Sequence, residues 1–200
     1  DNGDGTYTAT VYTKVTDEYM DSVAQAEVTN KVKVTNNKGY TYEGNYSVRT
    51  PGKNWQINKT AGQYDKATNM ISWTVKIPNV PKGIESVTLE DDMRAYGSTA
   101  GNMAYICNAV LSYTNENNVT SQVNVTNADG TYISNSVITS YTQGGITSGN
   151  QYGYVFNFAD DVFSSDGTRI TDMTLTYQTK VLDTDLESVQ RTFQNSATLK

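Results

Sequence analysis

The chain has 200 residues and a formal net charge of −6, with no prominent cluster of Lys and Arg. This charge balance argues against nucleic acid and anionic membrane surfaces as partners. No apolar run approaches the roughly 20 residues of a membrane-spanning helix. Histidine is absent and Cys107 is the single cysteine, so the commonest general base and metal ligand is missing and an intrachain disulfide is impossible. We therefore expect no metal, no cofactor and no enzymatic turnover.

Short runs rich in Val, Ile, Thr and Tyr alternate with clusters of Asn, Gly and Asp along the whole chain. This pattern is typical of an all-β protein, and no stretch shows a convincing helical period. From residue 51 onward we predict strands over 55–60, 71–77, 87–93, 105–113, 119–125, 130–138, 152–158, 173–182 and 191–200. Roughly eight or nine short antiparallel strands predict a two-sheet, immunoglobulin-like β-sandwich.

The N-terminal part of the chain repeats features of its C-terminal end. The sequence TKVTD at Thr13–Asp17 matches TKVLD at Thr179–Asp183, and Thr29–Val32 matches Gln194–Ala197 in the same order. We interpret this as an internal repeat with a period of about 165 residues.

The repeat predicts how the chain is divided. Residues 1–50, with strands over 6–16 and 26–35, are expected to be the C-terminal strands of a preceding module. Residues 51–200 are expected to form one complete module, with 39–52 as the connection. The alternative is that residues 1–50 add strands to the same sandwich.

Three predicted strands each carry one polar residue on an otherwise apolar face: Lys59 beside Trp55 and Ile57, Asp91 between Leu89 and Met93, and Asn195 between Phe193 and Ala197. Alternate residues of a strand share a face, so all three polar groups are expected to point into the core. A buried lysine costs several kcal/mol unless it is paired or neutralised.

A lysine, an acid and an asparagine that meet in a dry core have one specific reaction open to them. Burial favours a neutral, nucleophilic Lys59 amine and a protonated Asp91 that can hydrogen-bond the Asn195 carboxamide. The amine then attacks the carboxamide carbon, Asp91 relays protons, and ammonia leaves. The product is a Lys59–Asn195 isopeptide bond, made once without turnover, which would tie the first strand to the last. The alternative is that the shared parity is chance, with Lys59 extending to solvent at a strand end and Asp91 capping a turn.

The same residues carry a resemblance to a known family. Lys59, the strand MISWTVKI at Met70–Ile77, VTLEDDM at Val87–Met93 and FQNSATL at Phe193–Leu199 resemble, in order and spacing, domains of the collagen-adhesin A-region type. That family comprises surface adhesins and pilin stalks of Gram-positive bacteria. The resemblance covers most of residues 51–200, and the tail of such a domain recurs at 6–34.

The resemblance implies an immunoglobulin-like fold with an intramolecular isopeptide bond carried by Lys59 and Asn195, with Asp91 as the catalytic acid. The adjacent Asp92 leaves the choice of acid open, and Pro78 displaces the asparagine that usually follows the tryptophan strand. Asn30 matches Asn195, but the lysine and acid that would serve it are not found in the chain, so we expect Asn30 to be uncrosslinked.

The resemblance also implies a function. It indicates a non-enzymatic, extracellular structural or adhesive module of a bacterial surface protein, attached to the cell wall through a region outside this chain. Its expected partners are neighbouring modules of the same protein and a host extracellular-matrix protein or glycan. The alternative is a carbohydrate- or matrix-protein-binding sandwich without a crosslink, for which the tyrosine-rich stretches 40–46 and 152–154 are candidate contact sites.

Overall fold

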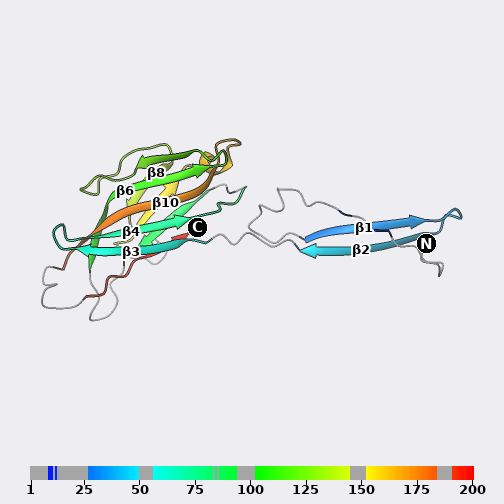
Figure 1. Cartoon of the computed structure of the whole chain (residues 1–200), viewed down its shortest axis with the longest axis horizontal. Coiled ribbons are helices and arrows are strands. Elements are labelled where there is room, and N and C mark those ends of the chain that lie inside the picture. The colour runs from blue at the N-terminus through cyan, green and yellow to red at the C-terminus, as the bar shows by residue number, and fades with distance from the viewer. Residues whose placement is uncertain are drawn as a thin grey trace. The chain divides into compact units, whose positions relative to one another are not determined.

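The computed structural model describes residues 9–10, 12, 27–49, 56–82, 84, 86–93, 102–144, 152–183 and 191–200. The chain divides into two compact units, Asp1–Asn54 and Trp55–Lys200. Nearly all of the described elements are strands (Figure 1). Within the described part of the chain, no helix is long and apolar enough to cross a membrane.

The described part of the first unit is a β-hairpin. Strand β1 (Glu27–Thr35) pairs antiparallel with β2 (Thr41–Arg49). The turn between them is held by Asn36, whose side-chain oxygen accepts hydrogen bonds from the backbone N–H groups of Lys38 and Tyr40. The strand predicted over 26–35 is therefore confirmed, but the connection predicted over 39–52 is wrong because β2 occupies most of it. The strand predicted over 6–16 lies almost wholly outside the described residues.

The two faces of this hairpin differ in polarity. One face carries apolar side chains that remain largely exposed: Val32, Val34, Tyr42, Tyr46 and Val48. The opposite face carries cross-strand ion pairs, Lys33 with Glu43 at 3.7 Å and Arg49 with Glu27 at 3.8 Å. An alternation of apolar and charged side chains of this kind is typical of an antiparallel sheet that buries one face.

The second unit is built from two antiparallel sheets. The five-stranded sheet has the order β3-β4-β10-β6-β7, and the four-stranded sheet has the order β11-β5-β9-β8. The strands are β3 (Asn58–Asp65), β4 (Met70–Ile77), β5 (Thr88–Asp92), β6 (Met103–Asn115), β7 (Thr120–Asn124), β8 (Ile138–Gln143), β9 (Tyr154–Phe158), β10 (Ile170–Val181) and β11 (Ser196–Leu199). The predicted fold class, an all-β antiparallel sandwich of immunoglobulin type, is confirmed.

The core lies between the inner faces of these two sheets. Strand β4 shows most plainly how alternate residues face the core. Its buried residues are Ile71, Trp73, Val75 and Ile77, and the intervening Ser72 and Lys76 are exposed. Strand β5 contributes Leu89 and Asp91 from the facing sheet, both with no exposed surface. Side chains of alternate residues point to opposite faces, so the apolar alternation of each strand fixes which face is inward.

Two predicted strands differ from the structure, and the described residues contain a helix that the sequence pattern does not predict. Residues 130–137 form a looped segment in place of the predicted strand, and β8 begins at Ile138. The Asn135 side chain accounts for this loop, because its oxygen accepts hydrogen bonds from the N–H groups of Val137 and Ile138 and so competes with ladder pairing. The predicted strand 191–200 is shortened to β11, and a one-turn helix, α2 (Asp161–Ser164), follows β9.

Candidate functional site

The candidate site lies where the edge strands of the two sheets approach each other. Strand β3 is an edge of the five-stranded sheet and β11 is an edge of the four-stranded sheet. Lys59 is opposite Val75 in the β3–β4 register, and Asn195 immediately precedes β11. The rings of Tyr64 and Phe193 stack with centroids 6.4 Å apart, which ties the approach to β11 against β3. Trp55, expected on the same face as Lys59, lies outside the described residues.

The Lys59 side chain is nearly buried and points at an acid. Only 9% of the side chain is exposed, and Nζ lies 2.5 Å from Asp91 Oδ2. Nζ also lies over two aromatic rings, 5.3 Å from the centroid of Trp73 and 5.4 Å from that of Tyr177. Burial lowers the pKa of Lys59, although the neighbouring Asp91 opposes this shift. The environment therefore favours the neutral, nucleophilic form of the amine more than water does.

Asp91 is the buried acid of the site. Its side chain has no exposed surface, and Oδ2 accepts hydrogen bonds from Lys59 Nζ and from the Tyr177 hydroxyl. Within the described part of the chain, Oδ1 is buried without a hydrogen-bond partner. Asp92 is half-buried on the opposite face of β5, so the acid that contacts Lys59 is Asp91.

Asn195 is linked to this acid through a tyrosine. Its side-chain nitrogen donates a hydrogen bond of 3.2 Å to the Tyr177 hydroxyl. Its oxygen Oδ1 is buried and finds no partner among the described residues. Asn195 and Lys59 line one open cavity of ≈ 450 Å³, together with Trp73 and Phe193. The structure thus brings the three predicted residues, Lys59, Asp91 and Asn195, into one cluster.

Tyr177 is a member of the cluster that the sequence did not single out. It lies on β10 beside Trp73 of β4 and is 2% exposed. Burial, and after it the Asp91 charge, raise the pKa of Tyr177 well above its ordinary value, so the hydroxyl remains protonated. Its alternation with Leu175 and Met173 places it on the inner face, but tyrosine is common in strands and this signal alone does not mark a functional residue.

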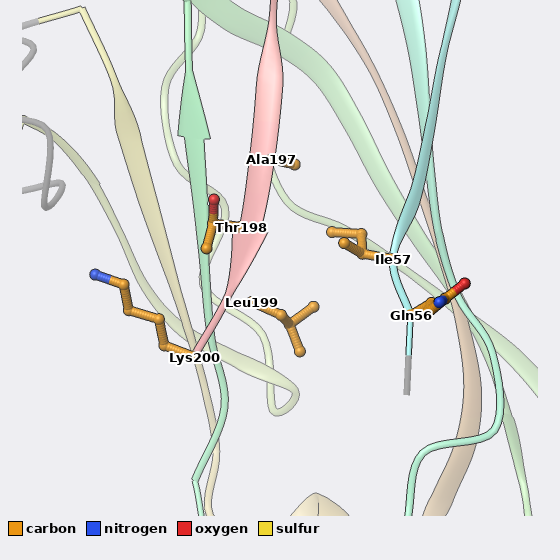
Figure 2. Close-up of a pocket in the computed structure, with 6 residues that line it drawn as sticks. All are labelled: Gln56, Ile57, Ala197, Thr198, Leu199 and Lys200. Carbon is orange, nitrogen blue, oxygen red and sulfur yellow. The ribbon is translucent and has the colours of Figure 1, made fainter. Parts of the chain in front are cut away.

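Next to the polar cluster, the two edge strands meet through apolar side chains. Figure 2 shows Ile57 pointing toward Ala197 and Leu199, while Gln56 points away from them. These residues line a second pocket together with Thr198 and Lys200. At the outer side of β11, Lys200 Nζ pairs with Glu90 at 2.7 Å. The contact between β3 and β11 is therefore apolar next to the Lys59–Asn195 pair, on the side where Ile57 faces Ala197 and Leu199.

Two unpaired buried acceptors define the chemistry available here. Asp91 Oδ1 and Asn195 Oδ1 both lack a donor among the described residues, and a buried acceptor without a donor costs about 1–3 kcal/mol. The cluster therefore contains a nucleophilic amine, a buried acid and a carboxamide, which are the groups required for an amine to displace ammonia from an amide.

The remaining sequence candidates lie elsewhere. Asn30 is exposed on β1, opposite Tyr46 of β2. Cys107 is buried, and burial raises the pKa of its thiol. Among the residues that the structure describes, no group of three or more Cys, Asp or Glu side chains is arranged to hold a metal ion.

No protein-family model and no curated protein matches the chain. Solved structures with a similar course of the chain include the collagen-binding domain of the Erysipelothrix rhusiopathiae surface protein RspB. The two structures superimpose with a TM-score of 0.45 and share 15% sequence identity. The match covers 88% of this chain and 50% of the RspB chain. A collagen-binding domain from a Staphylococcus aureus adhesin has a TM-score of 0.40 and 11% identity, with coverages of 72% and 83%.

The collagen adhesin CNA of S. aureus has a TM-score of 0.41 and 13% identity, with coverages of 80% and 48%. The chain thus spans about half the length of the RspB and CNA structures.

Proposed function

We propose that the second unit is a non-enzymatic structural or adhesive module of an extracellular bacterial surface protein. We propose further that an autocatalytic isopeptide bond between Lys59 and Asn195 stabilises it. The observation that carries this proposal is the contact of Lys59 Nζ with the fully buried Asp91, 2.5 Å away, in a cluster that also holds Asn195. A buried charged lysine and aspartate are costly as a purely structural pair, whereas a neutral amine beside a protonated acid is suited to attack on a carboxamide.

In the proposed reaction, the neutral amine of Lys59 attacks Cγ of Asn195. Asp91 provides a proton to the amide oxygen as negative charge develops there and accepts a proton from Nζ. The Nζ–Cγ bond forms, and the proton taken from Nζ is passed on to Nδ2. The amide oxygen returns its proton to Asp91 as the carbonyl re-forms, the Cγ–Nδ2 bond breaks, and one ammonia leaves. The nucleophile is consumed, so the reaction occurs once for each chain and the module does not turn over a substrate.

The test is the intact mass of the purified protein. We expect it to lie about 17 Da below the sequence mass, because one ammonia is lost for each bond formed. Lys59→Ala and Asn195→Ala should each restore the full mass, and digestion of the wild type should yield one branched peptide containing both residues. Gln194→Ala, which changes the exposed neighbour of Asn195, should leave the mass loss unchanged. A wild-type protein of full mass would refute the crosslink.

We propose in addition that residues 1–50 are the C-terminal strands of a preceding module and that 51–200 form a complete one. The hairpin supports this division, because β1 and β2 form a two-stranded sheet of their own with one largely exposed apolar face. An isolated two-stranded hairpin is marginally stable. Removal of residues 1–54 should leave the unfolding temperature of the second unit unchanged. A fall in that temperature would instead favour strands added to the same sandwich.

A binding function is the second candidate, favoured by the exposed tyrosines Tyr40, Tyr42 and Tyr46 of the first unit. Exposed aromatic rings are suited to stack on a sugar or on a partner protein. Binding of the full chain to immobilised collagen and to a glycan array tests this, with Tyr42→Ser and Tyr46→Ser as variants. Binding that is lost in these variants would support the role, and no binding to either surface would remove it.

A further inference from the structure

The Tyr177 hydroxyl hydrogen-bonds both the acid and the carboxamide of the cluster. It donates to Asp91 Oδ2 and accepts from Asn195 Nδ2 at 3.2 Å. Lys59 Nζ contacts the same Oδ2 atom from the other side at 2.5 Å. A continuous chain of hydrogen bonds therefore runs from the amine through Asp91 and Tyr177 to the amide nitrogen of Asn195.

We propose that Tyr177 is a catalytic residue of the crosslinking reaction, which passes a proton from Asp91 to the leaving nitrogen of Asn195. This inference rests on the proposed isopeptide bond and assigns a further group to it. The amide nitrogen must gain one proton before it can leave as ammonia, and the Lys59 nitrogen must lose one. Tyr177 is in hydrogen-bond contact with that leaving nitrogen, whereas the hydrogen bond of Lys59 is to Asp91.

The proton count balances along this path. Attack of Lys59 Nζ on Cγ forms the new C–N bond, and one Nζ proton moves to Asp91 Oδ2. The Tyr177 hydroxyl gives its proton to Nδ2 and takes the proton held by Oδ2, so that Tyr177 ends unchanged. The amide oxygen returns to Asp91 the proton that it received during the attack, the Cγ–Nδ2 bond breaks, and NH₃ leaves. The hydrogen bond between Asn195 and Tyr177 reverses direction in this step, because Nδ2 acquires a lone pair once Cγ becomes tetrahedral.

The surroundings of Tyr177 suit a relay that never carries a charge. The residue is 2% exposed, and it lies on β10, the central strand of the five-stranded sheet, between β4 and β6. Ionisation of the phenol next to Asp91 is disfavoured, so the hydroxyl must receive a proton as it gives one. General acid–base groups of this kind contribute about 10²–10⁴-fold to a rate.

The experiment follows crosslinking in freshly made full-length chains from cell-free synthesis, by intact mass against time. Tyr177→Phe should slow ammonia loss by about 100-fold or more. Tyr141→Phe is the matched control: Tyr141 is a half-buried tyrosine of the same core whose hydroxyl donates to the Ile106 carbonyl at 3.3 Å. We expect this control to crosslink at the wild-type rate. Circular dichroism of both variants in the Asn195→Ala background reports whether the fold is retained.

Replacement of Tyr177 by 3,5-difluorotyrosine separates proton transfer from structure, because it keeps the hydroxyl but makes it more acidic. As the pH is raised, the rate of ammonia loss should begin to fall at a lower pH than in the wild type. A Tyr177→Phe protein that crosslinks at the wild-type rate would overturn the relay and leave the proposed bond intact. Should Tyr177→Phe fail to fold, a difluorotyrosine protein with the wild-type pH profile would overturn it. A wild-type chain that never loses ammonia would overturn the proposed function itself.

Discussion

Lys59 Nζ lies 2.5 Å from Asp91 Oδ2, although the two residues belong to different sheets of the sandwich. The contact crosses the core, and the acid has no exposed surface. This relationship separates Asp91 from its neighbour Asp92, which lies on the other face of β5.

The first prediction distinguishes these two acids. Asp91→Asn should give a protein of full mass, because an amide cannot carry the proton between the amine and the carboxamide. Asp92→Asn makes the same chemical change one residue away and should still lose about 17 Da, the mass of one ammonia. Intact mass spectrometry measures both. The assignment of the acid fails if the two variants give the opposite result.

The second prediction concerns stability. A bond between Lys59 and Asn195 would close a loop of about 135 residues, for which the chain-entropy model gives about 5 kcal/mol. Asn195→Ala should therefore lower the free energy of unfolding by an amount of this order, measured in guanidinium chloride. Asn195→Ala is preferable to Lys59→Ala here, because removal of the lysine leaves Asp91 buried without its partner.

Gln194→Ala is the control for this measurement, and its unfolding free energy should stay within about 0.5 kcal/mol of the wild type. Equal stabilities of the wild type and the Asn195→Ala protein would argue against a covalent contribution.

The third prediction concerns pH. In the Asn195→Ala protein the Lys59 amine remains free, and burial lowers its pKa in the folded state. Between the folded and the unfolded pKa the unfolded chain binds the extra proton, so stability should rise with pH in this alkaline window. The crosslinked wild type has no titrating amine at this position and should lack the rise.

Urea unfolding at several pH values up to about 10 measures this difference. The raised pKa values of Tyr177, Tyr141 and Tyr154 act in the opposite direction above that range and are present in both proteins. Parallel pH profiles for the two proteins would contradict the prediction.

The fourth prediction concerns the ring beneath the amine. Trp73 Nε1 donates a buried hydrogen bond of 2.9 Å to Thr179 Oγ1. Thr179→Val leaves this donor unsatisfied and should cost about 1–3 kcal/mol of unfolding free energy. Thr176→Val, at an exposed position of the same strand, is the control and should change stability by less than about 0.5 kcal/mol. Both variants are best measured in the Asn195→Ala background. If Thr179→Val leaves the unfolding free energy unchanged, the Trp73 donor is satisfied in another way.

The sequence predicted the inward position of Lys59, Asp91 and Asn195, because strand alternation is a local property. Asp91 shares its face with Leu89 and Met93, and all three are buried. The catalytic roles of the three residues stay predictions until the mass is measured. Tyr177 could not be selected in the same way, since its importance comes from contacts with Asp91 and Asn195 across the core, which no local pattern encodes.

The errors in the predicted elements have a similar origin. Residues 130–137 contain strand-forming residues, but the backbone N–H groups of Val137 and Ile138 donate hydrogen bonds to the Asn135 side-chain oxygen and hold the segment in a loop. Strand β2 lies within the connection predicted over 39–52. Gly39 does adopt a positive φ of 82° in the turn, whereas Gly44 lies within β2, opposite Val32.

The four residues of the cluster come from β3, β5, β10 and the approach to β11. They are drawn from both sheets and from nearly the whole length of the second unit, so they meet once the last strand has docked. A chain that is misfolded, or whose last strand has not yet docked, lacks this reactive arrangement. Only a molecule that has completed folding would then lose ammonia. The mass spectrum of a protein sample would therefore give the fraction of molecules that had folded completely.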